Sequence, residues 1–359
     1  MHHALFSVSR CRRPVITGPV ITVLTVMSTL GFLLLMLCGI SGCDTTGRSL
    51  PAGAAAAQQP LKVVVTTSMV GDLVRQVAGE HAHVSGLMGE GVDPHLFRPT
   101  SRDLGLMMQS EIIFYSGLGL EGAMQSALER VQKNGKIVSA VTSQLPHDRL
   151  IFSKRFSNHP DPHVWNDAGL WAECLDEVVS VLSRAAPEHA AEFSTNAEDY
   201  RKKLQKMDQY ARDSIASIPK ESRFLITAHD AFSYFARAYQ IEERAVQGIT
   251  TESEPGVQDI NNLVDFMVKN RIPALFVEAT VNAANLQAVI EGAQQRNWQI
   301  HKGGTLYSDS TGAPKTYEGT YLGMFDHNVT TITRELGGTA PLKGLNGRLT
   351  FSGIGEINP

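Results

Sequence analysis

Residues 187–218, PEHAAEFSTNAEDYRKKLQKMDQYARDSIASI, form a helical pattern of unusual length. The stretch has no glycine, and its single proline stands at the first position, where a helix tolerates it. Apolar residues recur along it at helical spacing, for example at Phe193, Tyr200 and Leu204. A helix of about thirty residues is on the order of 45 Å long at 1.5 Å per residue. Because one small lobe does not need such a helix, we expect it to connect two lobes.

On both sides of this stretch, short β-branched runs alternate with helical patterns. The runs predict strands at residues 61–67, 84–88, 111–115, 136–141, 223–228 and 273–278. Strands that alternate with helices indicate a mostly parallel sheet flanked by helices. The predicted fold is therefore α/β, with an N-terminal lobe at 61–185, a linking helix at 186–218 and a C-terminal lobe at 219–359. The last predicted helix covers 317–336.

The composition excludes several classes of protein. The chain has 359 residues, of which 43% are hydrophobic and 19% charged, and its formal net charge is −4. This apolar fraction is normal for a globular protein, and the length suits about two domains. The near-neutral charge argues against nucleic-acid binding, which needs a strongly basic surface. Three of the four cysteines precede residue 44, so Cys174 has no partner for an internal disulfide.

The first 42 residues have the organisation of an export signal. A basic start at residues 10–13 precedes an uncharged apolar run at residues 21–40, and small residues follow. A plain transmembrane anchor is the alternative, since the run is nearly long enough to span a bilayer. Under both interpretations the remainder of the chain lies outside the cytoplasmic membrane.

The end of the apolar run, LCGISGC at residues 37–43, resembles the bacterial lipobox. The resemblance implies that Cys43 receives a lipid and becomes the first residue of the mature protein. Residues 43–60 follow with an alanine run and no apolar period, so we expect a flexible tether between the lipid and the folded domain.

Two segments of the chain share the sequence Asp-Pro-His. His95 follows a predicted strand in a loop with two prolines, and His163 precedes the helical middle of the chain. The proline fixes the backbone before each imidazole. The preceding aspartate, Asp93 or Asp161, is placed to orient the ring.

A third histidine and a carboxylate occur in comparable places. His229 directly follows the predicted strand 223–228, and Asp309 lies in a predicted loop. Ligands of α/β sheets bind in the crevice beyond the carboxyl ends of the strands, which His95 and His229 border and the loops of His163 and Asp309 can reach. Three imidazoles and one carboxylate suit a divalent metal ion such as Zn²⁺ or Mn²⁺. These four residues are therefore the candidate metal ligands.

The chain from residue 61 to residue 336 resembles the metal-binding receptors of bacterial ABC importers, cluster A-I, and most closely the TroA type. The matching segments are GVDPH (91–95), DPHVW (161–165), TAHDAFSYF (227–235), YSD (307–309), EGTY (318–321) and DHN (326–328). The resemblance implies two α/β lobes bridged by a long helix, with the metal held between them. It assigns ligand roles to His95, His163, His229 and Asp309.

The same resemblance implies a function without catalysis. We expect a lipid-anchored extracytoplasmic receptor that captures Zn²⁺ or Mn²⁺ and delivers it to the membrane permease of an ABC importer. We further expect a monomer that touches the membrane through the lipid on Cys43 and binds no nucleic acid.

The sequence leaves the choice between the two metals open. Zinc-specialised members of the family usually carry a long histidine-rich loop before the second ligand, whereas residues 143–162 hold only His147 and His159. Many manganese-specialised members have a glutamate at the third ligand position, where this chain has His229. The missing loop favours manganese, and the additional histidine favours zinc.

Two other functions compete with this interpretation. A secreted zinc-dependent hydrolase would use three histidines around a metal with an open coordination position. However, the chain has no HExxH motif to supply a general base. A metal-stabilised adhesin is the other alternative.

Three further patterns predict no functional site. Residues 117–122, GLGLEG, fit the GxGxxG pattern, but the next strand does not end in the acidic residue of a dinucleotide site, so we predict a tight turn. His189 and Glu192, three residues apart, predict a solvated helix face. His81 is predicted to be an ordinary surface residue.

Overall fold

The computed structural model describes residues 59–152 and 159–350, and these residues belong to one compact unit. The predicted export signal, Cys43 and nearly all of the predicted tether lie outside the described residues. Within the described residues, no helix is long and apolar enough to cross a membrane.

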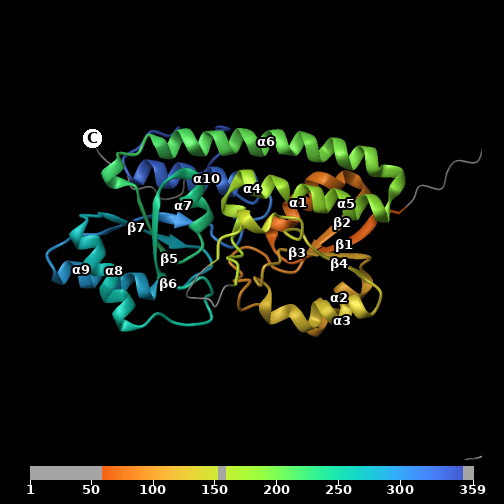
Figure 1. Ribbon diagram of the computed structural model, residues 1–359, viewed down its shortest axis with the longest axis horizontal. Coiled ribbons are helices and arrows are strands. Elements are labelled where there is room, and N and C mark those ends of the chain that lie inside the picture. Colours follow the sequence, from red (N-terminus) through yellow and green to blue (C-terminus); the bar gives the residue numbers. More distant parts are fainter. Residues whose placement is uncertain (1–58, 153–158, 351–359) are drawn as a thin grey trace, which may run out of the picture. The chain divides into compact units, whose positions relative to one another are not determined.

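The long helix that the sequence predicts is present. α6 covers Ala190–Ala216, 27 residues, and a 3₁₀ turn at Pro187–His189 precedes it. One of its faces buries Phe193, Ala197, Tyr200, Leu204, Met207, Ala211 and Ile215. α6 packs against helices from both sides of it in the chain: α1 (Ser68–Ala78), α4 (Ala168–Glu173), α5 (Leu175–Ala185), α7 (Ser233–Tyr239) and α10 (Tyr321–Glu335). The two halves of the chain therefore share one long helical support (Figure 1).

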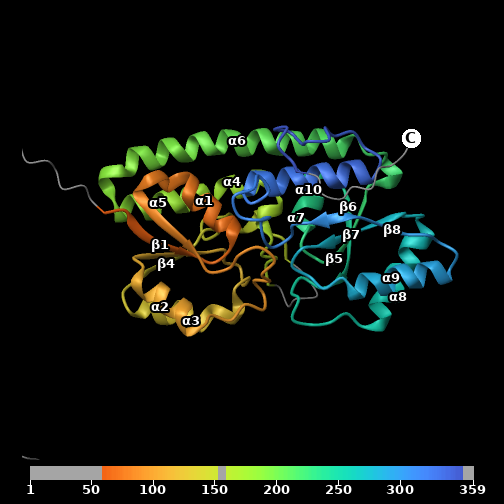
Figure 2. The same cartoon turned by 180° about the vertical axis from the view of Figure 1, so that it is seen from behind.

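The N-terminal half contains a four-stranded parallel sheet with the strand order β2-β1-β3-β4. The strands are β1 (Leu61–Val65), β2 (Ala82–Gly86), β3 (Ile112–Tyr115) and β4 (Ile137–Ala140). Successive residues of β1 face opposite layers. Val63 and Val65 pack in the core with α1 and α5, while Val64 packs with α2 (Ser101–Gln109) and α3 (Gln125–Lys133). Helices thus cover both faces, as parallel sheets require (Figure 2).

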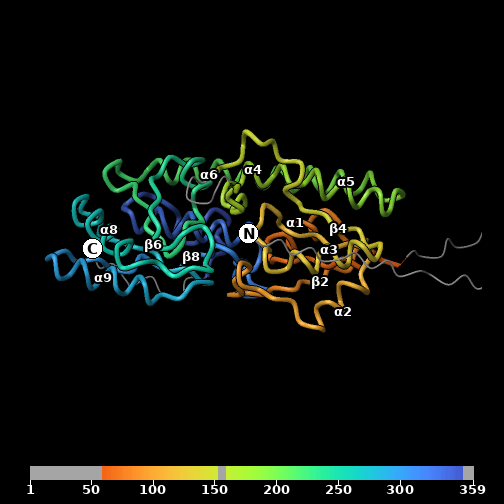
Figure 3. The backbone as a smooth tube through the Cα atoms, turned by 60° about the horizontal axis from the view of Figure 1, so that its bottom comes forward, coloured from red at the N-terminus to blue at the C-terminus, as the bar shows by residue number. Residues whose placement is uncertain are grey.

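The C-terminal half contains two pairs of parallel strands. β5 (Phe224–His229) pairs with β6 (Glu242–Gln247), β7 (Ala274–Glu278) pairs with β8 (His301–Leu306), and β5 lies beside β7. One face packs against α8 (Val257–Lys269) and α9 (Ala284–Gln295) in a core of its own. The other face packs against α7 and α10 and belongs to the same core as β1 and α6. Figure 3 shows α8 and α9 in the left half of the view and α2 and α3 in the right half.

The α/β fold with parallel sheets flanked by helices is confirmed, but the sequence analysis missed two strands. β6 carries charged residues at three of its six positions, and β8 contains Gly303 and Gly304, so neither has the apolar pattern of a buried strand. Glycine is required at 303, because a Cβ atom there would lie 2.9 Å from the ring of Phe276. The last helix also begins later than predicted, at Tyr321, because the side chain of Thr320 caps it by accepting a hydrogen bond from the Gly323 amide.

Candidate metal centre

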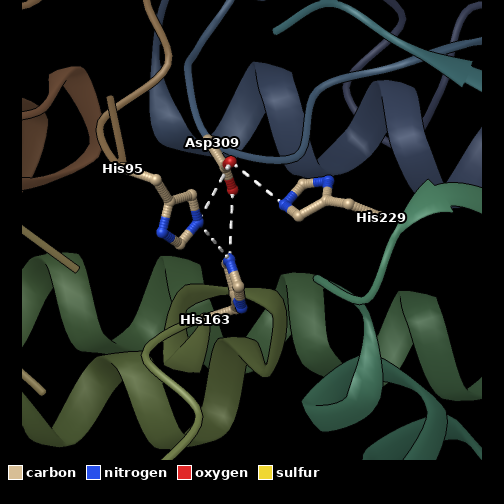
Figure 4. A group of neighbouring side chains, drawn as sticks. All are labelled: His95, His163, His229 and Asp309. Carbon is tan, nitrogen blue, oxygen red and sulfur yellow. Dashed lines mark hydrogen bonds and ion pairs between the residues drawn. The ribbon is translucent and has the colours of Figure 1, made fainter. Parts of the chain in front are cut away.

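The four candidate ligands come from four separate segments. His95 lies in the loop that follows β2, and His163 immediately precedes the 3₁₀ turn that leads into α4. His229 is the last residue of β5, and Asp309 lies in the loop after β8. All four side chains are buried, none more than 3% exposed. The structure therefore brings together all four residues that the sequence selects (Figure 4).

Three imidazole nitrogens converge on the Asp309 carboxylate. Nε2 of His229 lies 3.1 Å from Oδ2 of Asp309, and Nε2 of His163 lies 3.5 Å from Oδ1. Nε2 of His95 is 3.8 Å from Oδ2 of Asp309 and 3.2 Å from Nε2 of His163. Donor atoms about 2.1 Å from one tetrahedral ion lie about 3.4 Å from one another. The observed spacings thus fit the ligands of a single ion.

The centre leaves buried polar atoms without hydrogen-bond partners. Both carboxylate oxygens of Asp309 and Nε2 of His229 lack a hydrogen bond of good geometry among the described residues, although Nε2 and Oδ2 lie 3.1 Å apart as an ion pair. Buried polar atoms in this state raise the free energy of the fold, and they call for an ion or another polar partner. A divalent cation at the centre satisfies all of them, so the residues present fit a bound metal.

Carboxylates hold the outer nitrogens of two of the imidazoles. Oδ1 of Asp161 lies 2.8 Å from Nδ1 of His163, and Oε2 of Glu278 lies 2.5 Å from Nδ1 of His229. A carboxylate at Nδ1 keeps the proton of a neutral imidazole on that atom and turns the Nε2 lone pair toward the centre. The expectation that Asp161 orients its imidazole is therefore met.

Asp93 has a different role from the one expected. Its Oδ1 accepts a hydrogen bond from the backbone amide of His95 at 2.9 Å, and its Oδ2 accepts one from the hydroxyl of Thr251 at 2.5 Å. Asp93 thus fixes the backbone of the His95 loop and ties it to the loop after β6. In both Asp-Pro-His segments Oδ1 of the aspartate accepts a hydrogen bond from the backbone amide of the histidine, but only in the second does it also lie beside the ring.

Sequence reasoning missed Glu278. Its Oε1 accepts hydrogen bonds from the backbone amides of Ala228 and His229, at 2.7 and 2.9 Å, while its Oε2 faces the ring of His229. The available signal was an acidic residue at the carboxyl end of an apolar strand, Ala274–Glu278, in an α/β fold. Pairing that strand with the one that ends at His229 required knowledge of the sheet.

The charges at the centre set the protonation states of three ligands. Burial lowers the pKa of His95 to about 3. Burial also acts to lower the pKa of His229, but the carboxylates of Glu278 and Asp309 raise it well above its usual value. Burial acts to raise the pKa of Asp309, but the three neighbouring histidines hold it well below its usual range. At neutral pH His95 is therefore neutral, Asp309 is ionised, and His229 carries a proton that a metal ion would have to displace.

The GxGxxG pattern forms the tight turn that the sequence analysis predicts. The carboxylate of Glu121 accepts hydrogen bonds from the amides of Ser116 and Gly117, at 2.7 and 3.1 Å, and from the hydroxyl of Thr66 at 2.7 Å. These amides already donate to a carboxyl group of the chain itself, so they are not available to the pyrophosphate of a dinucleotide.

The chain is similar to metal-binding proteins of bacteria. A sequence model of the family described as "Zinc-uptake complex component A periplasmic" (ZnuA) matches residues 63–335. The manganese-binding lipoprotein MntA of Bacillus subtilis is 40% identical over 299 residues, which cover 83% of this chain and 95% of that protein. The zinc-binding protein TroA of Treponema pallidum is 38% identical over 286 residues, or 79% of this chain and 91% of that protein. A solved structure of the periplasmic zinc-binding protein TroA of Treponema pallidum superposes with a TM-score of 0.75 at 36% identity, over 78% of this chain and 99% of that one.

Proposed function

The chain belongs to the ZnuA family of periplasmic zinc-uptake components, and on this premise we propose that His95, His163, His229 and Asp309 together hold the divalent metal ion that it carries. The protein is a solute-binding protein of a metal ABC importer and not an enzyme, so the hydrolase alternative is not favoured. The protein is extracytoplasmic. The ion is cargo, which the protein captures and then releases to the permease.

One observation supports the ligand assignment more than any other. Three imidazole nitrogens from three segments lie within 3.8 Å of one buried carboxylate. His95 and His163 precede α6 in the chain, and His229 and Asp309 follow it. The metal thus joins a lobe at residues 61–185 to a lobe at residues 219–359, with the linking helix at 186–218 behind them.

The ligand set accepts both candidate metals. Imidazole suits Zn²⁺, and a carboxylate suits Mn²⁺ as well, while the affinity of a given site for Mn²⁺ is intrinsically lower than for Zn²⁺. Named relatives bind one or the other: manganese in MntA of Bacillus subtilis and zinc in TroA of Treponema pallidum. The cargo of this chain is therefore Zn²⁺ or Mn²⁺, and elemental analysis of the purified protein, followed by competition between the two ions, decides between them.

Single alanine substitutions test the ligand assignment. His95→Ala, His163→Ala, His229→Ala and Asp309→Ala should each weaken metal binding strongly in a calorimetric titration, because four ligands from four segments leave little redundancy. The matched controls are His83→Ala and His159→Ala, both at exposed positions, which should leave the affinity of the buried centre unchanged. If a ligand variant binds as tightly as the controls, the assignment is wrong.

Lipid anchoring and oligomeric state are part of the same proposal. The lipobox-like segment at residues 37–43 supports lipid attachment at Cys43, and the relative MntA is named a lipoprotein. Cys43→Ala should release the chain from the membrane fraction of the expressing bacterium or leave its export signal uncleaved. If the variant is cleaved at the same bond and stays membrane-bound, Cys43 is not the anchor.

All four proposed ligands come from one chain, which supports a monomer. Light scattering of the purified protein tests the oligomeric state.

A further inference from the structure

A second group of metal-ligating side chains lies outside the buried centre. His81 lies in the 3₁₀ turn at Gly79–His81, between α1 and β2, while His189 and Glu192 lie where α6 begins. One donor atom from each of the three lies within 4.8 Å of the others. Their sequence context predicts solvated surface residues and gives no sign that the fold brings His81 to the other two. We infer that these residues form a second, surface zinc site, which the proposed cargo site does not require.

The contacts within this group are close. Nε2 of His81 lies 2.8 Å from Oε2 of Glu192, and the rings of His81 and His189 stack with their centroids 3.7 Å apart and their planes 19° from parallel. The lone pair of an imidazole nitrogen lies in the plane of its ring, so the lone pairs of two stacked rings run parallel and do not converge on one point. Binding of one ion by both rings therefore requires one ring to tilt. The side chains of His81, His189 and Glu192 are 17%, 30% and 52% exposed, which leaves them room to tilt.

A buried aromatic side chain, Phe193, packs against the rings of both histidines. Phe193 is fully buried and meets His81 edge to face at a centroid distance of 5.8 Å, and His189 at 6.2 Å. His189 and Glu192 stand three residues apart at the start of α6, so both side chains lie on the same side of the helix. The Phe193 ring thus gives both imidazoles an apolar contact, and both side chains stay partly exposed, so an ion can reach them.

The charges around the group favour a cation. A cavity of about 50 Å³ beside His81 and His189 is also lined by Glu80 and Glu188, and no lysine or arginine is among its described lining residues. Oε1 of Glu188 lies 3.9 Å from Nε2 of His189. The cavity has room for a water molecule, which completes the coordination that two imidazoles and one carboxylate begin.

The donor set selects zinc over manganese. Two imidazoles and a carboxylate with a water molecule form a coordination that Zn²⁺ takes, and Mn²⁺ binds more weakly to the same nitrogen ligands. The site is also expected to be weaker than the buried centre, because no described carboxylate is fixed at the outer nitrogen of either ring in the way that Asp161 and Glu278 hold His163 and His229. A bound zinc would tie the corner between α1 and β2 to the start of α6.

The metal stoichiometry of the purified chain tests this inference. Protein prepared without an affinity tag from cells expressing the whole chain should bind two equivalents of Zn²⁺, one tight and one weaker, but one equivalent of Mn²⁺. The double variant His81→Ala/His189→Ala should bind one equivalent of Zn²⁺ and keep the tight affinity. The matched control His83→Ala/His159→Ala should still bind two. A single zinc equivalent in the unaltered chain, or two in the double variant, would overturn the second site.

Two more variants separate this site from the cargo site and guard against misfolding. Glu192→Gln keeps a polar side chain of the same shape but removes the charge, and it should lose the weaker zinc equivalent. His163→Ala should lose the tight equivalent and keep the weaker one, so the two sites fail independently. Circular dichroism of each metal-free variant, compared with the unaltered chain, confirms that the fold is intact. A Glu192→Gln protein that still binds two equivalents would also overturn the second site.

Discussion

Oε2 of Glu278 lies 2.5 Å from Nδ1 of His229, at the ends of two neighbouring strands in the C-terminal half. Both side chains are buried, and the other oxygen of Glu278 accepts two backbone amides of β5. The carboxylate is therefore fixed by the sheet, and it in turn fixes which imidazole nitrogen faces Asp309. In the proposed metal site Glu278 is a positioning residue, since it would act on the ion through His229.

Glu278→Gln should weaken metal binding by about 10–100-fold, the usual effect of losing the partner of a metal-bound imidazole. The amide oxygen of the glutamine has to accept the two β5 amides, so its NH₂ group faces Nδ1 of His229. That ring nitrogen must then accept a hydrogen bond, which moves the proton to Nε2 and blocks the lone pair for the metal. A competition titration with a zinc chelator measures the loss.

Glu252→Gln is the matched control for this substitution, because Glu252 is exposed in the loop after β6. It should leave the affinity unchanged. An affinity of Glu278→Gln equal to that of the control would mean that the orientation of His229 does not depend on Glu278.

Metal binding near neutral pH should release about one proton, and that proton comes mainly from His229. The carboxylates of Glu278 and Asp309 raise the pKa of His229 well above its usual value against the effect of burial, so the metal-free imidazole is charged at pH 7. Burial lowers the pKa of His95 to about 3, so this residue is already neutral and has no proton to release. Calorimetric titrations in two buffers with different ionisation enthalpies count the protons.

The sign of the pH dependence follows from the same competition. Protons compete with the ion for Nε2 of His229, so the affinity should rise with pH until the raised pKa of His229 is passed, and should fall toward acid pH. Glu278→Gln removes one of the two charges that raise this pKa, so it should release fewer protons at pH 7. Proton release that is zero in the unaltered chain would contradict the charged state of His229.

The sequence selected the four residues that the structure brings together in the buried centre, for physical reasons. His95 and His163 stand after prolines that fix the backbone, and His229 stands at a strand end, so local sequence already marked them. Glu278 had no such mark, because its role depends on the neighbouring strand and not on its own segment. The His81 group was missed for the same reason, since 108 positions separate His81 from His189 and only the packing of α1 against α6 joins them.

The strands were predicted where burial on both faces imposes an apolar run, as in β1. They were missed where charge or glycine interrupts it, as in β6 and β8. The long helix was predicted because apolar residues recur at helical spacing over several turns, so the pattern is visible in the sequence without knowledge of the tertiary contacts. Helix starts were less well predicted, since a cap such as Thr320 is recognised only once its hydrogen bond is known.

A buried hydrogen bond joins α6 to α1, in addition to their apolar contacts, and its removal should destabilise the fold. The hydroxyl of Tyr200 donates to Oδ2 of Asp72 at 2.6 Å, and both side chains are buried. Burial also raises the pKa of Asp72, so this carboxyl group depends on its remaining partners. Tyr200→Phe keeps the ring but removes the donor, which should cost about 1–3 kcal/mol in the free energy of unfolding. Urea denaturation measures this loss.

Tyr210→Phe is the matched control on the same helix. The Tyr210 hydroxyl pairs with Thr330 at 2.8 Å, but Tyr210 is only partly buried and Thr330 keeps Asp326 as a second partner. The control should lose less than Tyr200→Phe does. Equal losses in the free energy of unfolding would mean that the buried hydrogen bond to Asp72 stabilises the fold no more than the hydrogen bond of Tyr210 does.

Metal should stabilise the protein against heat without a wide closure of the lobes. An ion that binds only the folded chain adds about 2.7 kcal/mol of stability at a hundredfold excess over Kd, so the melting temperature of chelator-stripped protein should rise by several degrees. The lobe motion should be small, because α6 packs along both halves and one hydrophobic core runs through β1, α6, β7 and α10.

Calorimetric melting and small-angle scattering of metal-free and loaded protein measure the two effects. His163→Ala serves as the control that should lose most of the rise in melting temperature, leaving at most a small part from the surface site. A large drop in radius of gyration on loading would rule out the stiff support, and an unchanged melting temperature would rule out an ion that bridges the two halves.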